Sequence, residues 1–128
     1  MIKINNDKYD NYDIKITYGK FNIVKFDEKL SGVSPFIMFN VGDNIFLGIE
    51  TVIYKDILEN IKLKEKKDLT CYLTDITYED EKGWISFINE KYYFYITKIS
   101  DFDFKVDFSL ETLDEINVKI DCDIELIY

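Results

Sequence analysis

The clearest hydrophobic pattern in the chain runs from Phe102 to Tyr128. Apolar side chains occupy every second position from Phe102 to Leu110 and again from Ile116 to Leu126, with charged or polar side chains between them. A period of two indicates strands that turn one face to a core and the other to water. The polar segment 111–115 separates the two runs, so the pattern predicts an antiparallel hairpin.

The register of this hairpin can be predicted from its turn. Placing Leu110 opposite Ile116 brings opposite charges together near the turn and like charges together at the far end, and like charges in direct opposition are unfavourable. A shift by two residues keeps the same core face but re-pairs the charges, so the register stays open. In the first register the outer pairs are Asp107–Lys119, Lys105–Asp121, Asp103–Asp123 and Asp101–Glu125.

A group of carboxylates falls on the outer face of the hairpin in either register. Runs of charge usually form a face that is only solvated, and the functional alternative is a docking patch for a positively charged partner. The group consists of Asp101, Asp103, Asp121, Asp123 and Glu125.

The rest of the chain alternates short apolar runs with turn residues. Predicted strands lie at residues 2–4, 14–18, 21–23, 35–41, 45–49, 69–73, 84–89 and 92–99, with Pro35 opening its strand. Predicted turns lie at 19–20, 42–44 and 90–91, and predicted loops at 6–11, 27–34 and 76–83. The pair 84–89 and 92–99 is apolar on both faces, which favours an interior position over an exposed aromatic patch around Trp84, Tyr93 and Tyr95.

One segment changes to a helical period. Val52, Ile53, Ile57, Leu58 and Ile61 predict a helix over residues 51–64, with Thr51 as N-cap and an i,i+4 pair between Lys55 and Glu59. We expect this helix to cover a sheet edge or the mouth of a barrel.

These elements predict a fold that is mainly β (α+β). The chain has 128 residues, which suits a single β-rich domain over 1–128. About ten short strands with frequent turns indicate an antiparallel β sandwich or a partly open barrel, with one helix near residues 51–64.

Composition and sequence patterns indicate the compartment in which we expect the protein. Hydrophobic residues make up 47% of the chain, which excludes disorder. The start of the chain lacks the apolar centre of a signal peptide, and no apolar run approaches the ~18 residues of a membrane span. Cys71 and Cys122, both expected at inward-facing strand positions, fit a reduced compartment. We therefore expect a cytoplasmic protein that does not bind membranes.

The residues that carry most enzyme chemistry are scarce. The chain has no histidine to act as a base at neutral pH, and neither cysteine has a neighbouring histidine or arginine to activate it. A carboxylate pair such as Asp103 and Asp123 is the only general acid–base candidate, and abundant carboxylates produce such pairs by chance. Zinc and calcium ligand spacings are missing. We expect no catalytic residues, no metal and no cofactor.

Charge points to a protein partner. A net charge of −9 and a pI near 4.5 argue against nucleic acid as a ligand and suit a basic protein surface. The leading hypothesis is a non-catalytic inhibitor, such as a bacterial immunity protein or antitoxin that neutralises a basic toxin of the nuclease type, as monomer or homodimer. The alternatives are a phage-type nucleic-acid mimic, a small-ligand-binding β-barrel protein and a structural assembly subunit.

Two surfaces are candidates for binding this partner, because tyrosine and tryptophan make interface anchors and carboxylates steer a cationic surface. The first consists of Asp101, Asp103, Asp121, Asp123, Glu125 and Tyr128, and the second of Tyr78, Glu79, Asp80, Glu81 and Trp84.

Overall fold

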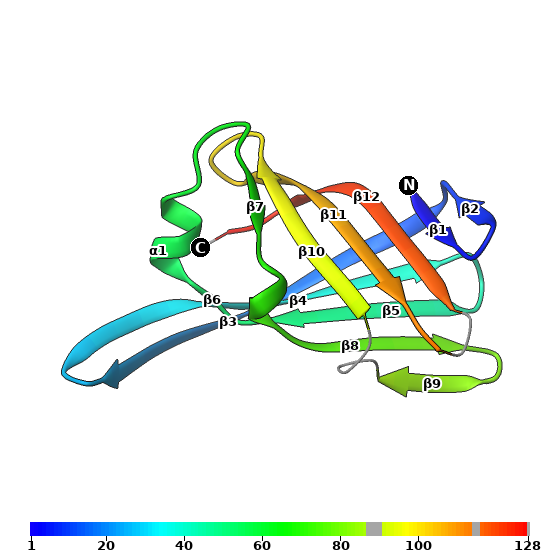
Figure 1. Ribbon diagram of the computed structural model, residues 1–128, viewed down its shortest axis with the longest axis horizontal. Coiled ribbons are helices and arrows are strands. Elements are labelled where there is room, and N and C mark those ends of the chain that lie inside the picture. Colours follow the sequence, from blue (N-terminus) through cyan, green and yellow to red (C-terminus); the bar gives the residue numbers. More distant parts are fainter. Residues whose placement is uncertain (87–90, 114–115, 128) are drawn as a thin grey trace.

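The computed structural model describes residues 1–86, 91–113 and 116–127, without the side chains of residues 23, 25 and 84–86. Two antiparallel sheets make up most of this part (Figure 1). The prediction of a mainly β sandwich or partly open barrel is confirmed. No helix in the described residues is long and apolar enough to cross a membrane.

Sheet A joins both ends of the chain. Its strands are β1 (Ile2–Ile4), β2 (Asp7–Tyr9), β7 (Lys66–Asp68), β10 (Lys91–Lys98), β11 (Asp103–Glu111) and β12 (Asn117–Glu125). They lie in the order β2-β1-β12-β11-β10-β7, so the first strands of the chain pair beside the last. The presence of β2 corrects the prediction of a plain loop over residues 6–11, since Asp7–Tyr9 pairs back on β1.

Sheet B is built from the middle of the chain. Its strands are β3 (Tyr12–Lys25), β4 (Glu28–Val41), β5 (Ile45–Thr51), β6 (Ile53–Tyr54), β8 (Leu73–Asp80) and β9 (Gly83–Ser86). The order is β3-β4-β5-β8-β9, and β6 pairs with β4.

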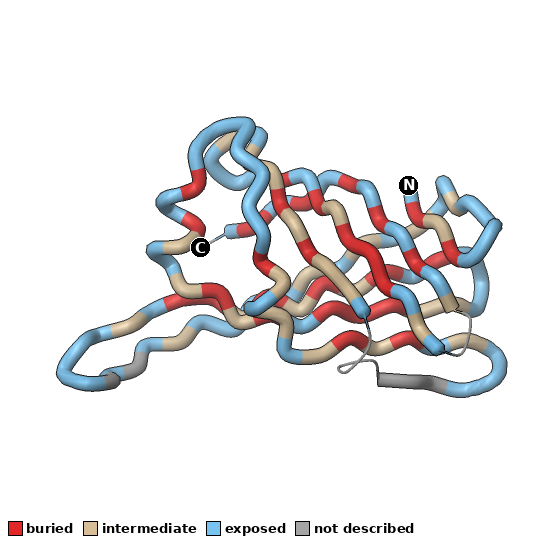
Figure 2. Tube along the Cα trace, in the orientation of Figure 1, coloured by how far each residue is buried: buried red, intermediate tan, exposed pale blue. Residues whose placement is uncertain are grey.

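The core lies between the inner faces of the two sheets, as the buried stretches in Figure 2 show. Its largest fully buried side chains include Phe39 from sheet B and Phe94, Phe104 and Phe108 from sheet A. The edge strand β3 also reaches across to sheet A, where the Tyr18 hydroxyl donates a hydrogen bond of 2.6 Å to the Glu125 carbonyl oxygen. The sandwich is therefore partly closed along this edge.

The C-terminal hairpin has the predicted faces but not the first predicted register. Leu110 lies opposite Val118 rather than Ile116, so every pair is displaced by two residues. The alternating positions between Phe104 and Ile124 are buried as expected, whereas Phe102 lies before β11 and is 45% exposed. Core burial is the same in both registers, so it does not select between them. The link between the strands covers residues 112–116 instead of 111–115, so the turn keeps its length and lies one residue later in the chain.

The helix is much shorter than predicted. The α-helix α1 covers only Lys55–Glu59, and its N-cap is Tyr54. Thr51 ends β5 instead, where its buried hydroxyl donates to the Pro35 carbonyl oxygen at 3.1 Å. The predicted Lys55–Glu59 ion pair is present at 3.6 Å.

A long two-stranded arm replaces several predicted turns and loops. The strands β3 and β4 pair continuously to a turn at Phe26 and Asp27, so residues 19–20 form no turn and residues 27–34 form no loop. Pro35 lies inside β4, between the residues that pair with β6 and those that pair with β5. The tip of this arm extends beyond the other strands of both sheets (Figure 1).

The segment between residues 66 and 98 departs most from the prediction. Residues 76–83, expected as a loop, belong mostly to β8, and the stretch 69–73 is mainly a 3₁₀ turn at Thr70–Tyr72, which leaves Cys71 exposed. The predicted hairpin of 84–89 with 92–99 is wrong, because β9 pairs with β8 in sheet B while β10 pairs with β11 and β7 in sheet A. Residues 87–90, which include Glu90 of the predicted turn, lie outside the described residues.

Candidate functional site

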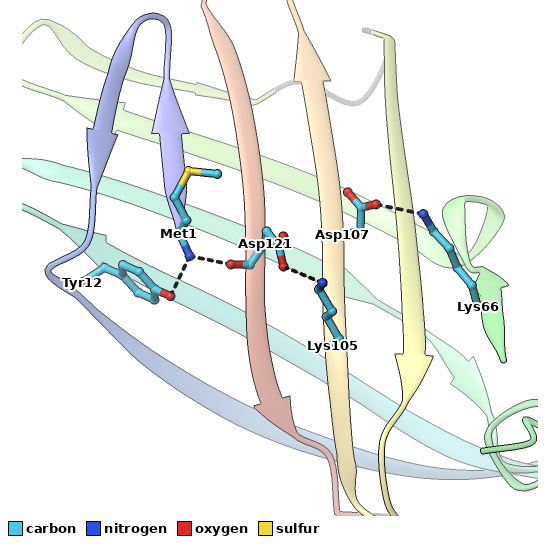
Figure 3. Close-up of polar contacts among 6 residues, drawn as sticks. All are labelled: Met1, Tyr12, Lys66, Lys105, Asp107 and Asp121. Carbon is cyan, nitrogen blue, oxygen red and sulfur yellow. Dashed lines mark hydrogen bonds and ion pairs between the residues drawn. The ribbon is translucent and has the colours of Figure 1, made fainter. Parts of the chain in front are cut away.

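Ion pairs cross the middle of the outer face of sheet A. Lys105 Nζ on β11 lies 3.4 Å from Asp121 Oδ1 on β12, and Lys66 Nζ on β7 lies 3.0 Å from Asp107 Oδ2 on β11. Figure 3 shows these pairs together with the Met1 ammonium, which donates to the Asp121 carbonyl oxygen and to the Tyr12 hydroxyl. Asp107 and Asp121 are direct cross-strand neighbours, so these lysines offset the repulsion between two like charges.

Two tyrosines border this network on β10. The rings of Tyr93 and Tyr95 meet edge to face with centroids 5.3 Å apart, and Lys66 Nζ lies 4.9 Å from the Tyr95 centroid. The hydrogen bond to Asp107 raises the pKa of Lys66 above its ordinary value. Tyr93 and Tyr95 are half-buried, whereas Phe94 and Ile96, which alternate with them along β10, are buried. The strand therefore buries only one of its two faces, although the sequence is apolar on both.

One end of the outer face keeps its negative charge. Asp103 lies directly opposite Glu125, and Asp123 lies opposite Lys105, whose ammonium pairs with Asp121 instead. Within the described residues the carboxylates of Asp103, Asp123 and Glu125 form no ion pair. Asp101 lies in the turn before β11 and is exposed. We call Asp101, Asp103, Asp123 and Glu125 the acidic end.

Exposed apolar side chains surround the acidic end. Ile99 is 49% exposed, Phe102 45% and Ile127 52%. Backbone hydrogen bonds hold them in place: the Ile99 N–H donates to the Asp103 carbonyl oxygen at 2.9 Å, and the Leu126 N–H donates to the Phe102 carbonyl oxygen at 2.8 Å. The turn before β11 and the chain after β12 therefore present apolar and acidic groups side by side.

The first predicted surface is thus only partly assembled. Asp101, Asp103, Asp123 and Glu125 come together at the acidic end, whereas Asp121 lies in the neutralised middle of the sheet. Tyr128 lies outside the described residues. Sequence reasoning missed Ile99 and Ile127, and it placed Phe102 in the core, because the period of two continues through Phe102 although the strand begins only at Asp103.

The second predicted surface lies at the turn between β8 and β9, at the opposite end of the molecule (Figure 1). Tyr78 is only 5% exposed and packs in the core, where burial raises the pKa of its hydroxyl to about 12. Glu79 and Glu81 are exposed and Asp80 is half-buried, with Glu81 accepting a hydrogen bond from Asn44 at 3.2 Å. The side chain of Trp84 lies outside the description. Among the side chains described at this turn, the aromatic one, Tyr78, is buried and so does not stand beside the exposed charge.

The carboxylates of the acidic end are open to solvent. They lie on strands and a turn, where nothing shelters them from water in the way that a tuned acid–base pair requires. Three surface hollows among the described residues have volumes of about 160 to 220 Å³, below the ~300 Å³ at which small-molecule pockets begin. The acidic end therefore combines exposed negative charge with exposed apolar side chains.

No protein-family model, no curated protein and no solved structure matches this chain.

Proposed function

We propose that this protein is a non-catalytic inhibitor that binds a basic protein through the acidic end, in the manner of a bacterial immunity protein or antitoxin that neutralises a nuclease-type toxin. One observation carries the proposal: the carboxylates of Asp103, Asp123 and Glu125, which form no ion pair within the described residues, share one end of the molecule with three exposed apolar side chains, those of Ile99, Phe102 and Ile127.

This combination is what a protein interface requires. Apolar side chains at the centre of a contact supply most of the binding free energy, and surrounding charges steer the partner and fix its orientation. The acidic end stands on β11 and β12, whose inner faces are anchored in the core, so the surface is held rigid before it binds. A rigid surface loses less conformational entropy on association.

The other candidate functions fit these features less well. A nucleic-acid mimic needs carboxylates along an extended surface, whereas Lys105 and Lys66 interrupt the carboxylates of sheet A. A ligand carrier needs an aromatic-lined cavity, and the three hollows described above are small and lie on the surface.

The test is binding to the protein encoded by the adjacent gene, measured by calorimetry at 50 and 500 mM NaCl. We expect affinity to fall at least tenfold in high salt, since exposed charge interactions are screened. Glu125→Lys and Phe102→Ala are each expected to weaken binding at least tenfold.

Glu79→Lys is the matched control, because it makes the same charge change at the opposite end of the molecule and should leave the affinity within twofold. Absence of binding would remove the proposal. Equal losses for Glu125→Lys and Glu79→Lys would show that net charge, rather than the acidic end, controls association.

A further inference from the structure

Three lysines form a row across one end of sheet A. Lys8 on β2 lies opposite Lys3 on β1, and Lys3 lies opposite Lys119 on β12. The neighbours of Lys3 and Lys119 along their strands point into the core, so the row lies on the outer face. β12 runs from Asn117 to Glu125, and Lys119 lies near its start. The row therefore lies toward the end of the strand that is opposite to the acidic end.

Like charges in this arrangement cost stability. Directly opposed like charges on adjacent strands are unfavourable, and here one lysine has two such neighbours. Within the described residues none of the three ammonium groups forms an ion pair, and Lys3 is half-buried. Elsewhere on the same face Asp107 and Asp121, which are also opposed, each have a lysine partner. The lysine row lacks the corresponding anion.

A hollow lies against this row, with a volume of about 160 Å³. That is the share of liquid volume of about five water molecules, enough for a phosphate group and part of its hydration. Its polar lining consists of Lys3, Asn5, Ser109, Glu111, Asn117 and Lys119.

Asn5 has an orientation suited to an anion. Its backbone is left-handed, with φ 55°, and its Oδ1 accepts the Asn117 N–H at 2.9 Å. This bond assigns the carbonyl side of the amide to the backbone and leaves the NH₂ group as a donor. The Ser109 hydroxyl, on the strand next to Lys119, adds a second neutral donor.

We infer that this hollow binds the phosphate group of a small ligand, held by the ammonium groups of Lys3 and Lys119 with Asn5 and Ser109 as neutral donors. Lysine binds phosphate as a point charge, and Lys8 adds to the local potential. The net charge of the protein does not prevent this, because charges more than about 8 Å away are largely screened at physiological ionic strength.

Glu111 is the carboxylate in the lining, and it opposes an anion. Its Oε2 lies 3.9 Å from Lys91 Nζ, and both side chains are mostly exposed, so Lys91 offsets its charge only weakly. Neutralising Glu111 should therefore strengthen phosphate binding. Damage to the fold would weaken phosphate binding, so a gain in affinity cannot be caused by such damage.

The test is a titration of the intact protein with inorganic phosphate, followed by amide chemical shifts in NMR spectra, against sodium chloride at equal ionic strength. We expect saturable shifts at Lys3, Asn5, Ser109 and Lys119 with phosphate only. Lys119→Gln should weaken binding at least fivefold, and Glu111→Gln should tighten it two- to fivefold. Lys29→Gln, which makes the same charge change on the arm, should leave the affinity unchanged.

A second titration with adenosine monophosphate distinguishes the source of the phosphate. Binding tighter than that of inorganic phosphate, with added shifts at Tyr93 beside Ser109, would assign the site to a phosphorylated ligand, and equal affinity would assign it to free phosphate. The inference is overturned if phosphate and chloride give the same shifts, or if Lys119→Gln and Lys29→Gln respond alike.

Discussion

Gly32 lies where the arm meets the body of the protein, and the ring of Phe21 covers it. A Cβ atom at this position would lie 2.3 Å from the Ile53 carbonyl oxygen and 2.5 Å from the Phe21 ring. The backbone oxygen cannot move aside as a side-chain tip could, because β6 pairs with β4 at this point. Phe21 in turn meets Tyr54 edge to face at 5.8 Å, so the glycine allows an aromatic contact that anchors the arm.

We predict that Gly32→Ala lowers the free energy of unfolding by about 1–3 kcal/mol, the usual cost of overpacking a filled site. Gly19→Ala on the same arm is the control, since its Cβ would meet only ordinary contacts at 3.5 Å, and we expect a change within about 0.5 kcal/mol. Urea unfolding of both variants measures the difference. Equal stabilities would contradict the crowding at Gly32.

Two buried protons make the fold sensitive to alkali. Burial raises the pKa of the Cys122 thiol to about 11 from an ordinary value of 9.0, and that of the Tyr78 hydroxyl to about 12 from 10.0. Between pH 9 and about 11 the unfolded chain releases the Cys122 proton that the folded chain keeps. The same holds for the Tyr78 proton between pH 10 and about 12. The stabilisation is complete below pH 9 and is lost as pH rises through 11 and 12.

The free energy of unfolding should accordingly fall between pH 9 and 11, by up to about 2 kcal/mol from Cys122 alone. Cys122→Val, which keeps an apolar side chain of similar size, should reduce this dependence. Urea titrations at pH 8, 9, 10 and 11 provide the comparison. A stability independent of pH in the unmodified protein would show that Cys122 ionises freely when folded.

The arm ends in a turn without glycine. Phe26 and Asp27 have φ values of 51° and 63°, the left-handed pair that a type I′ turn requires. A bulky residue such as Phe26 adopts this conformation at a cost, and its side chain is 90% exposed. The backbone conformation of Phe26 therefore carries a cost at the arm tip.

Replacing Phe26–Asp27 by Asn–Gly should stabilise the turn by about 1 kcal/mol, because these residues favour positive φ. Amide hydrogen exchange in the arm should slow about fivefold, while exchange in β11 and β12 stays the same. Faster exchange in the arm would indicate that Phe26 stabilises the tip through its side chain more than its backbone costs.

Elements with a strong and regular pattern were predictable from sequence. The hairpin of β11 and β12 alternates without interruption, so its faces are correct, but its register rests on the turn alone and is displaced by two residues. The strand β8 was missed because its acidic residues suggested a loop, although Ile76 and Tyr78 alternate inward. Nothing local signals that β9 and β10 belong to different sheets, because that depends on partners far away in the chain.

Across the whole molecule, charge on sheet A is sorted by position. Carboxylates dominate the end near Glu125, ion pairs balance the middle, and lysines dominate the row at Lys119. The sequence predicted that acidic residues share a face, but it could not predict which of them lysines offset. That depends on register and on β7, where Lys66 comes from a distant part of the chain to pair with Asp107.

Clustering of like charge should cost stability that substitution can recover. Glu125→Lys would place a cation opposite Asp103, and we predict a gain of about 0.5 kcal/mol in the free energy of unfolding at 20 mM salt. The gain should disappear at 500 mM salt. A loss of stability at low salt would mean that Glu125 contributes favourable contacts that outweigh the repulsion.

The pairing of β1 with β12 also constrains how the protein is made. Ile2 lies beside Ile120, so β1 has no neighbour on that side until the distant strand β12 has been synthesised. Sheet B, assembled from the middle of the chain, can form earlier. Contacts between such distant residues slow folding, so we expect Ile2 and Ile4 of the nascent chain to stay exposed to water until β12 has left the ribosome.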